Sequence, residues 1–395
     1  MFSILFVLGT YPNYGGTEKV TTVLANELTQ KKHKVSIASF EQPRPSLIDE
    51  ELNKSIDILK LSYPVLKHSN LKLLEEFIIA KEINIIINQW CLPYFVTLLI
   101  NKARKNHKCS LISVLHGVPN QNKRLLDLLN RKNNTTNLVK QFAYKTAHAA
   151  MLWLTGLNLR FVYMHSDQYV VLSKSFIGTF LKLSKISNDN KIKVIANPIT
   201  IATPNNFNEI ITNKEKTILY VGRMDYTNKR VHRIVEAWEE ISDKYSKWNL
   251  VLVGDGPEKN TLVSYVKSKK IDRIIFEGFK KDAPTEFYKQ ASILLLTSDL
   301  EGFGLVVIES MIYGVVPIVY GSYTAIYDII EPGKSGFTTP MPYQKTNTVQ
   351  QIEKLIKNKS LRQKMSKAAH ERAQFFSLET IVEEWESLFS LSNSK

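Results

Sequence analysis

Two glutamates stand eight positions apart in the segment EGFGLVVIE, residues 301–309, with an apolar run between them. Burial in the first turns of a helix explains residues 305–308, but it does not explain Glu301 and Glu309. The preceding SILLLTSD is typical of a buried strand and the following LVVIESMIYG of a helix. The Glu-Gly-Phe-Gly sequence is therefore predicted at a strand-to-helix turn, where carboxylates can accept hydrogen bonds from hydroxyl groups of a ligand.

The glycines of this turn indicate phosphate chemistry. Gly302 and Gly304 allow backbone amides at the helix start to face a phosphate, because glycine lacks a side chain and a helix start favours an anion. Glu301 reaches hydroxyls on one side, and Glu309, a little over one turn into the helix, accepts from others. Paired diols around a diphosphate describe a sugar nucleotide. The candidate donor-binding residues of this segment are Gly302, Phe303, Gly304, Leu305 and Glu309.

Two cations follow another predicted strand in YVGRMDYTNKR. Gly222 ends the strand, and Arg223 and Lys229 stand six residues apart on the loop that follows. Arg offers bidentate bonding to a phosphate and Lys adds a point charge, so this loop is a candidate diphosphate site. The alternative interpretation is ordinary surface charge.

The first half of the chain has weaker candidates. Gly15 and Gly16 follow the first strand and a turn, and Thr17 is expected to cap the helix EKVTTVLANELTQ. These glycines let backbone amides approach an anion; the alternative is a turn that sterically requires glycine. His116 closes another strand, and it either projects into a cleft or is a structural histidine.

Short β-rich runs alternate with longer segments of helical spacing, which predicts an α/β fold with parallel sheets covered by helices. The pattern restarts after about Lys216, so we expect two doubly wound, Rossmann-like domains with ligands in an interdomain cleft at the carboxyl ends of the strands. The expected domains are residues 1–195 and 196–375. A helix over 376–395 is expected to pack back on the first domain.

Composition supports a soluble globular protein rather than a fibrous or membrane-spanning chain. The 395 residues include 44% hydrophobic and 23% charged residues, and two cysteines, Cys91 and Cys109, are too few for a disulfide framework. No apolar run approaches the roughly 20 residues that span a bilayer. The start MFSILFVLG fits a first strand better than a signal peptide, so we expect a cytoplasmic chain with room for a peripheral association at the inner face of the membrane.

The net charge of +15 is concentrated between Asn101 and His165, where eleven Lys or Arg stand against Asp127 alone. Such a patch attracts phosphates, and Leu138, Phe142 and Lys145 at helical spacing suggest docking on an anionic membrane surface. The alternative is a solvated basic face. Nucleic acid is disfavoured as a partner, because interleaved aromatic residues and a recognised nucleic-acid motif are lacking.

These motifs resemble those of the retaining glycosyltransferases of family 4, which have the GT-B fold of two Rossmann-like domains. The resemblance covers nearly the whole chain and is most specific at Glu-x7-Glu, matched by Glu301 and Glu309; VGRMDYTNK, GTEKVTTVLANEL and SVLHG match further motifs. It implies a bacterial enzyme of surface-polysaccharide type. Two residues depart from the family pattern. Arg230 follows Lys229 where family members often have glycine, and Asp328 stands where they often have glutamate.

The resemblance also assigns roles. Glu301 would contact sugar hydroxyls, Glu309 the nucleotide ribose, and Arg223 and Lys229 the diphosphate. Gly16 and His116 would face the donor from the first domain, and the loop around Lys280 would line the base. The residues that the resemblance places in catalysis are Arg223, Lys229, Glu301 and His116.

The expected reaction moves a hexose or N-acetylhexosamine from a nucleotide sugar to a glycan or lipid-linked acceptor. UDP is the expected carrier, because it is the commonest one in the family that the chain resembles. No Asp-x-Asp and no metal-ligand spacing of His, Asp and Cys occurs, so we expect no metal and no cofactor. Charge on the departing diphosphate would then be stabilised by Arg223, Lys229 and helix-start amides. Two alternatives are an epimerase-like GT-B enzyme that binds a nucleotide sugar without transfer and a basic nucleic-acid-binding protein.

Overall fold

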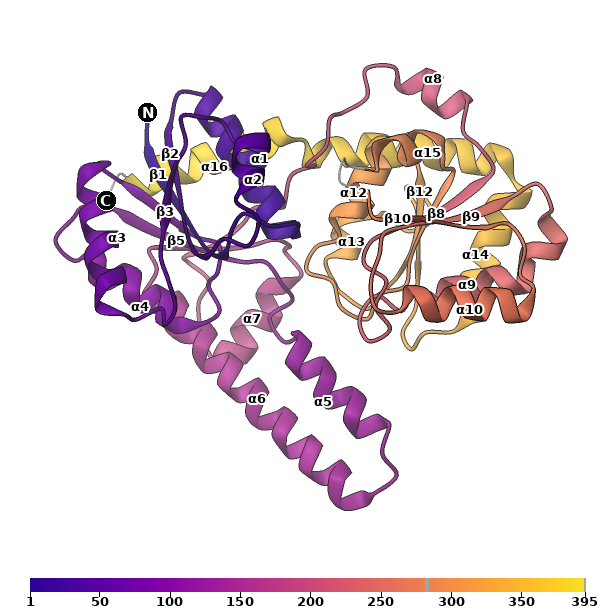
Figure 1. Ribbon diagram of the computed structural model, residues 1–395, viewed down its shortest axis with the longest axis horizontal. Coiled ribbons are helices and arrows are strands. Elements are labelled where there is room, and N and C mark those ends of the chain that lie inside the picture. Colours follow the sequence, from indigo (N-terminus) through magenta and orange to yellow (C-terminus); the bar gives the residue numbers. More distant parts are fainter. Residues whose placement is uncertain (281–283, 394–395) are drawn as a thin grey trace. The chain divides into compact units, whose positions relative to one another are not determined.

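The computed structural model describes residues 1–280 and 284–393 and divides the chain into two compact units (Figure 1). Unit 1 comprises Met1–Thr200 together with Leu378–Lys395, and unit 2 comprises Ile201–Ser377. Each unit contains one parallel β-sheet with helices on its faces. The predicted α/β class with two Rossmann-like domains is therefore confirmed.

The sheet of unit 1 has seven strands in the order β3-β2-β1-β4-β5-β6-β7, and every neighbouring pair is parallel. Its central strands are apolar and buried on both faces, as a sheet covered by helices requires. The strands are β1 Ser3–Thr10, β2 Lys34–Glu41, β3 Asp57–Lys60, β4 Ile85–Asn88, β5 Ser110–Leu115, β6 Gln168–Val171 and β7 Ile192–Val194.

The helices of unit 1 are α1 Gly16–Gln30, α2 Ser46–Glu51, α3 His68–Ala80, α4 Tyr94–Ala103, α5 Lys123–Asn133, α6 Leu138–Met164, α7 Phe176–Ser184 and α16 Leu378–Asn393. The last helix contacts α1, and Lys31 and His33 both bind Glu386 across 3.0 Å. Trp385 and Phe389 of α16 are buried in this unit. The end of the chain thus completes the first unit rather than the second.

The 27-residue α6 and the shorter α5 form an antiparallel pair that projects away from the sheet of unit 1 (Figure 1). Both are capped by asparagine: the side chain of Asn122 accepts from the amide of Leu125, and that of Asn137 accepts from the amide of Lys140. No helix of the described part of the chain is long and apolar enough to cross a membrane.

The sheet of unit 2 has six parallel strands in the order β10-β9-β8-β11-β12-β13. The strands are β8 Thr217–Val221, β9 Asn249–Val253, β10 Ile274–Gly278, β11 Ile293–Leu296, β12 Val316–Tyr320 and β13 Phe337–Thr339. In this order the direction of winding reverses between β8 and β11, as it does between β1 and β4 in unit 1. Ligands of doubly wound sheets bind at the carboxyl ends of the strands at such a reversal.

Unit 2 is covered by helices whose buried residues recur at helical spacing, as in α9, where Val231, Ile234, Val235, Trp238 and Ile241 are all buried. The helices are α8 Phe207–Thr212, α9 Val231–Ile241, α10 Lys259–Lys269, α11 Thr285–Gln290, α12 Leu305–Ile312, α13 Ile326–Ile329, α14 Lys345–Lys357 and α15 Lys359–Ala373, with 3-10 turns at Ser242–Tyr245 and Gln374–Phe376.

Candidate functional site

The loop after β8 presents an exposed cation. Gly222 ends the strand with a φ of 151°, a backbone conformation that favours glycine. The next residue, Arg223, is exposed, and its guanidinium forms no hydrogen bond or ion pair with any residue that the structure describes. Arg223 therefore stands at the reversal between β8 and β11 with its charge available to an anion.

Asp225 shapes the rest of this loop. Its Oδ1 accepts from the amides of Thr227 and Asn228 at 2.9 and 3.0 Å and from the Thr227 hydroxyl at 2.8 Å. Burial acts to raise the pKa of Asp225, but these hydrogen bonds and the charge of Arg223 hold it below its usual value. An ionised Asp225 thus fixes the turn that leads from Arg223 to Lys229.

Lys229 and Glu301, predicted separately as diphosphate and sugar contacts, form an ion pair in the structure. Lys229 Nζ lies 2.6 Å from Glu301 Oε1, although the residues are 72 positions apart. Both side chains are largely shielded from solvent. The fold therefore brings the cationic loop after β8 and the carboxylate after β11 into direct contact.

Arg230, which departs from the family pattern, adopts the left-handed conformation that glycine favours, with a φ of 53°. Its Nε donates to Asp299 Oδ2 at 2.5 Å, and Asp299 Oδ1 accepts from Arg233 Nη1 at 2.6 Å. The Thr297 hydroxyl donates to the carbonyl of Arg230 at 3.1 Å. The loop thus keeps the backbone expected for glycine, and Asp299 holds the arginine that replaces it.

The Glu-Gly-Phe-Gly segment forms the predicted turn from β11 into α12. Gly304 is the N-cap residue with a φ of 95°, and a Cβ there would collide with the Tyr323 hydroxyl. Phe303 is buried edge-on against Phe376, with ring centroids 5.7 Å apart. Gly302 and Leu305 are partly exposed beside these anchors. The packing fixes the turn and leaves the first amides of α12 at the edge of the sheet.

Glu309 lies deeper than Glu301. Its side chain is buried in the second turn of α12, and the Tyr288 hydroxyl donates to its Oε2 at 3.4 Å. Burial, and then the nearby charge of Glu309, raise the pKa of Tyr288 well above its usual value, so this tyrosine remains a donor. The contact of Glu309 with a ribose stays a prediction.

Several buried polar atoms at the carboxyl edge of the second sheet have no hydrogen-bond partner among the described residues. They are Asn228 Oδ1, Glu258 Oε2, Ser298 Oγ and Tyr323 Oη. Buried polar atoms are rarely left unpaired, and a polar ligand is one way to satisfy them. Ser298 and Tyr323 were missed in the sequence, although each follows a strand end, the same signal that drew attention to Arg223.

Glu258 is bound to the cationic loop after β8 and to the helix that follows it. It is buried, its Oε1 lies 2.9 Å from His232 Nδ1, and its amide donates to the carbonyl of Met224 at 3.1 Å. His232 in turn stacks on Tyr226, with ring centroids 4.3 Å apart. Nothing in the local sequence VGDGPE, residues 253–258, indicates this contact.

In unit 1, Gly15 is the N-cap residue of α1 and Gly16 its first residue. The expectation that Thr17 caps this helix is wrong, because the N-cap residue lies two positions earlier, at Gly15, and Thr17 lies inside the helix. Instead, the carboxylate of Glu18 folds back over Gly15, where a Cβ would collide with it. Burial raises the pKa of Glu18, and its own backbone amide partly opposes the shift. The close approach at Gly15 is thus to a flexible carboxylate, which a side chain at this position would displace.

His116 follows β5, and its Nε2 forms a hydrogen bond with Gln89 Oε1 at the end of β4. Burial lowers the pKa of His116 to about 4, so the ring is neutral near pH 7. Because Gln89 Oε1 is an acceptor, we assign the proton to Nε2, which leaves the buried Nδ1 as an acceptor without a partner among the described residues. His116 is thus prepared to receive a hydroxyl hydrogen bond rather than to give a proton.

Lys280 follows β10, the edge strand of the second sheet. Its Nζ lies 3.1 Å from Glu277 Oε2 and 5.8 Å from the centre of the Phe287 ring. Residues 281–283, which belong to the loop predicted to line the base, are outside the described residues, as are 394–395 of the predicted last helix. In the described ranges, no three His, Cys, Asp or Glu side chains are grouped as metal ligands would be.

Two parallel sheets wound in this order, with a cationic loop and a carboxylate-glycine turn at the reversal of the second, define the GT-B class of glycosyltransferase. Residues 14–203 match the model "Glycosyltransferase Family 4", and residues 203–372 match "Glycosyl transferases group 1". The chain belongs to the GT-B glycosyltransferases.

Three similar proteins cover nearly the whole chain. An "uncharacterized glycosyltransferase" of Haemophilus influenzae is 25% identical over 98% of this chain and 100% of its own. The Campylobacter jejuni GalNAc-alpha-(1->4)-GalNAc-alpha-(1->3)-diNAcBac-PP-undecaprenol alpha-1,4-N-acetyl-D-galactosaminyltransferase is 24% identical over 99% of each chain. The solved structure of Anabaena HepE in complex with UDP and glucose superposes with a TM-score of 0.71 at 17% identity, covering 99% of this chain and 100% of that one.

Proposed function

We propose that the chain transfers a hexose or N-acetylhexosamine from a nucleotide sugar, with UDP as the carrier, to a glycan or lipid-linked acceptor in polysaccharide or lipopolysaccharide biosynthesis. The observation that carries this proposal is the edge of the second sheet between β8 and β11. There, the exposed Arg223, the Lys229–Glu301 pair and the glycine turn at Gly304 lie in the loops that follow these two neighbouring strands. This set of groups fits a diphosphate flanked by hydroxyls.

In the proposed reaction, the bond between the anomeric carbon and the diphosphate oxygen breaks, and a bond from that carbon to an acceptor hydroxyl oxygen forms. Arg223, Lys229 and the amides at the start of α12 stabilise the charge on the leaving diphosphate. A diphosphate oxygen takes the acceptor proton, so the acceptor attacks the face that the nucleotide leaves and the anomeric configuration is retained. The proposal contains no metal ion and no cofactor.

The ion pair between Lys229 and Glu301 suggests that each of these side chains exchanges its partner when the donor binds. In the ligand-free chain the two side chains compensate each other across 2.6 Å. A bound donor would offer phosphate oxygens to Lys229 and sugar hydroxyls to Glu301. Each partner then exchanges one polar contact for another, so neither is left buried and unpaired.

The relatives support the classes of donor and acceptor. HepE was solved with UDP and glucose, and the Campylobacter enzyme is named for a glycan on PP-undecaprenol. We propose a similar lipid-linked glycan acceptor here, reached by a chain that acts on the cytoplasmic side of the membrane as a peripheral protein with an anionic lipid surface as partner. Nucleic acid is not part of the proposal.

The test is a panel of nucleotide sugars screened for thermal stabilisation of the purified chain, since a ligand at 100 times its dissociation constant stabilises by about 2.7 kcal/mol. We expect UDP-sugars to stabilise, and the best donor to release UDP only when a lipid-linked glycan is added. A bound donor whose UDP is never released by any acceptor, or whose sugar is altered in place, would contradict transfer and favour the epimerase-like alternative.

A further inference from the structure

The outward face of α6 is apolar and exposed along the length of the helix. Leu138, Val139 and Phe142 at its distal start are 78%, 79% and 72% exposed, and Trp153 is 56% exposed. Leu138, Phe142, Ala149, Trp153 and Leu157 recur at intervals of four or seven residues, so they share one side of the helix. We call this set the α6 face.

The opposite side of α6 packs on α5. Gln141, Tyr144, His148 and Met151, which lie on that side, are only partly exposed, and Leu125 of α5 is buried. The helix is therefore covered along one side and open along the other. An exposed contiguous apolar surface of this kind marks an interaction site.

The charge of the α5–α6 pair is almost entirely positive. Between residues 123 and 164 the cations are Lys123, Arg124, Arg131, Lys132, Lys140, Lys145 and Arg160, and Asp127 is the only acidic residue. Lys140, Lys145 and Arg160 lie on α6 and the others on α5. Lys145 and Arg160 stand three, four or seven residues from members of the α6 face, so they border it. Apolar side chains bordered by lysine and arginine fit a lipid surface with anionic headgroups.

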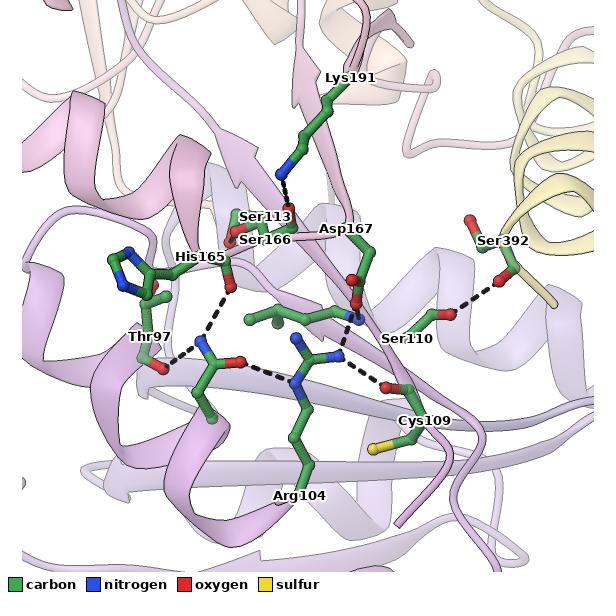
Figure 2. A network of polar contacts seen from close by, with 12 residues as sticks. Thr97, Arg104, Cys109, Ser110, Ser113, His165, Ser166, Asp167, Lys191 and Ser392 are labelled. Carbon is green, nitrogen blue, oxygen red and sulfur yellow. Dashed lines mark hydrogen bonds and ion pairs between the residues drawn. The ribbon is translucent and has the colours of Figure 1, made fainter. Parts of the chain in front are cut away.

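The base of α6 is fixed to the sheet of unit 1 by a polar network (Figure 2). Arg104, directly after α4, binds Asp167 Oδ2 at 2.5 Å and donates to the carbonyl of Cys109 at 2.6 Å, while Asn101 of α4 donates to the carbonyl of His165 at 2.9 Å. Lys191 donates to the carbonyl of Ser166 at 2.8 Å. These contacts hold the carboxyl end of α6, so the helix is presented as a fixed arm rather than a loose segment.

We propose that the α6 face docks on a bilayer that contains anionic lipid, with the helix lying in the headgroup plane. This proposal rests on the proposed function, in which the acceptor is lipid-linked, and names the surface by which the enzyme reaches it. A second copy of the chain fits the face less well, because it would bring two sets of like charges together. α5 begins seven residues after His116, so docking also holds that edge of the first sheet near the headgroups.

The experiment is co-sedimentation of the full chain with vesicles of phosphatidylcholine alone or mixed with phosphatidylglycerol. We expect binding only to the mixed vesicles, with affinity that falls as salt shortens the Debye length from about 10 Å at 0.1 M to about 3 Å at 1 M. Phe142→Ser with Trp153→Ser, and separately Lys140→Glu with Lys145→Glu, should each lower this affinity at least about tenfold.

Matched controls distinguish binding through the α6 face from effects of surface hydrophobicity or net charge in general. Ile79→Ser removes an exposed apolar residue from α3, and Lys364→Glu with Lys367→Glu makes the same charge change on α15; both should bind vesicles as the unaltered chain does. Equal loss in controls and face variants would overturn the proposal. Fluorescence of Trp153, isolated by comparison with Trp153→Phe, should be quenched by brominated lipid.

Two further measurements distinguish the outcomes. Affinity for UDP, measured by calorimetry, should be the same in the face variants, since the face lies outside the donor site. An unaltered chain that transfers sugar but ignores anionic vesicles would overturn the docking proposal and leave the proposed function standing. A dimer that becomes monomeric in Phe142→Ser with Trp153→Ser would show that the face joins two copies instead.

Discussion

The two sheets are wound in the same way around their first strand, but the residues at their carboxyl edges differ: those of unit 2 are charged and those of unit 1 are neutral. At the edge of unit 2, Lys229 binds Glu301, and Arg230 and Arg233 bind Asp299, with ion pairs of 2.5 to 2.6 Å. The exposed Arg223 lies on the same loop after β8 as Lys229. At the edge of unit 1, the predicted residues are two glycines and a neutral histidine bound to Gln89. One topology thus carries an edge suited to an anion and an edge suited to hydroxyl groups.

The difference assigns separate tasks to the two units. Recognition of a diphosphate requires fixed positive charge, which the described residues provide at the reversal of the second sheet. A buried neutral imidazole and backbone amides instead give directed hydrogen bonds without changing the net charge of the bound sugar. Variants at the two edges should therefore fail in different ways.

The largest expected effect is at the cationic edge. Arg223→Ala and Lys229→Ala should each lower kcat on the order of 10²-fold, because each removes a charge that stabilises the leaving diphosphate. Steady-state kinetics with the donor identified by the panel gives the measurement, and Lys364→Ala on α15 is the control. Near-normal turnover in both variants would remove the basis for placing the diphosphate at this edge.

The next comparison separates the two glutamates of α12 and its turn. Glu301→Gln should impair transfer much more than it changes the affinity for UDP, because the sugar is the expected ligand of this residue and Lys229, its partner in the ligand-free chain, keeps its charge. Glu309→Gln should weaken UDP binding itself, since the ribose is its expected partner. Calorimetry with UDP alone distinguishes them, and thermal unfolding checks the buried Glu309 variant for instability. Equal losses of UDP affinity would mean that the roles are wrongly divided.

At the neutral edge, His116→Asn should raise KM for the donor by about tenfold and leave the pH dependence of kcat between pH 6 and 8 unchanged, because the ring is already neutral there. The folded pKa of about 4 lies below the ordinary value of 6.5, so the unfolded chain binds the extra proton first as pH falls. Stability due to the neutral ring is present above pH 6.5 and is lost as pH falls toward 4.

Urea unfolding at a series of pH values checks the second part of this prediction. Between pH 6.5 and 4 the unaltered chain should lose at least about 1 kcal/mol more stability than His116→Asn. A kcat profile that follows a group titrating near pH 6.5, and that disappears in the variant, would instead make His116 a proton donor.

The smallest effect is expected at Tyr323, whose buried hydroxyl has no partner in the described ligand-free chain. Tyr323→Phe should leave stability unchanged or slightly raised, because an unsatisfied polar atom is removed. The same change should weaken donor affinity by up to about tenfold, if the hydroxyl binds the donor. Differential scanning calorimetry and UDP-sugar titration give the two numbers; a destabilised variant with full donor affinity would make the hydroxyl purely structural.

The sequence by itself determined the α/β class and where chemistry could occur along the chain. Apolar runs such as residues 85–88 and 293–296 are strands because every residue is buried between helix layers, and that leaves a continuous hydrophobic signal. A polar residue that closely follows such a run must lie near the carboxyl end of the strand. Arg223, Glu301 and His116 are examples. Shorter strands with exposed residues, such as β3 over Asp57–Lys60, gave no such signal.

Only the tertiary structure decided which of these residues meet and in what state. Lys229 pairs with Glu301 because β8 and β11 are neighbours in the sheet, although two strands intervene in sequence. Arg230 has a left-handed backbone, and its guanidinium is bound by Asp299, which lies 69 residues away in the sequence. The lowered pKa of His116 and the unpaired hydroxyl of Tyr323 arise from burial, which sums contributions from many segments and is therefore absent from any local pattern.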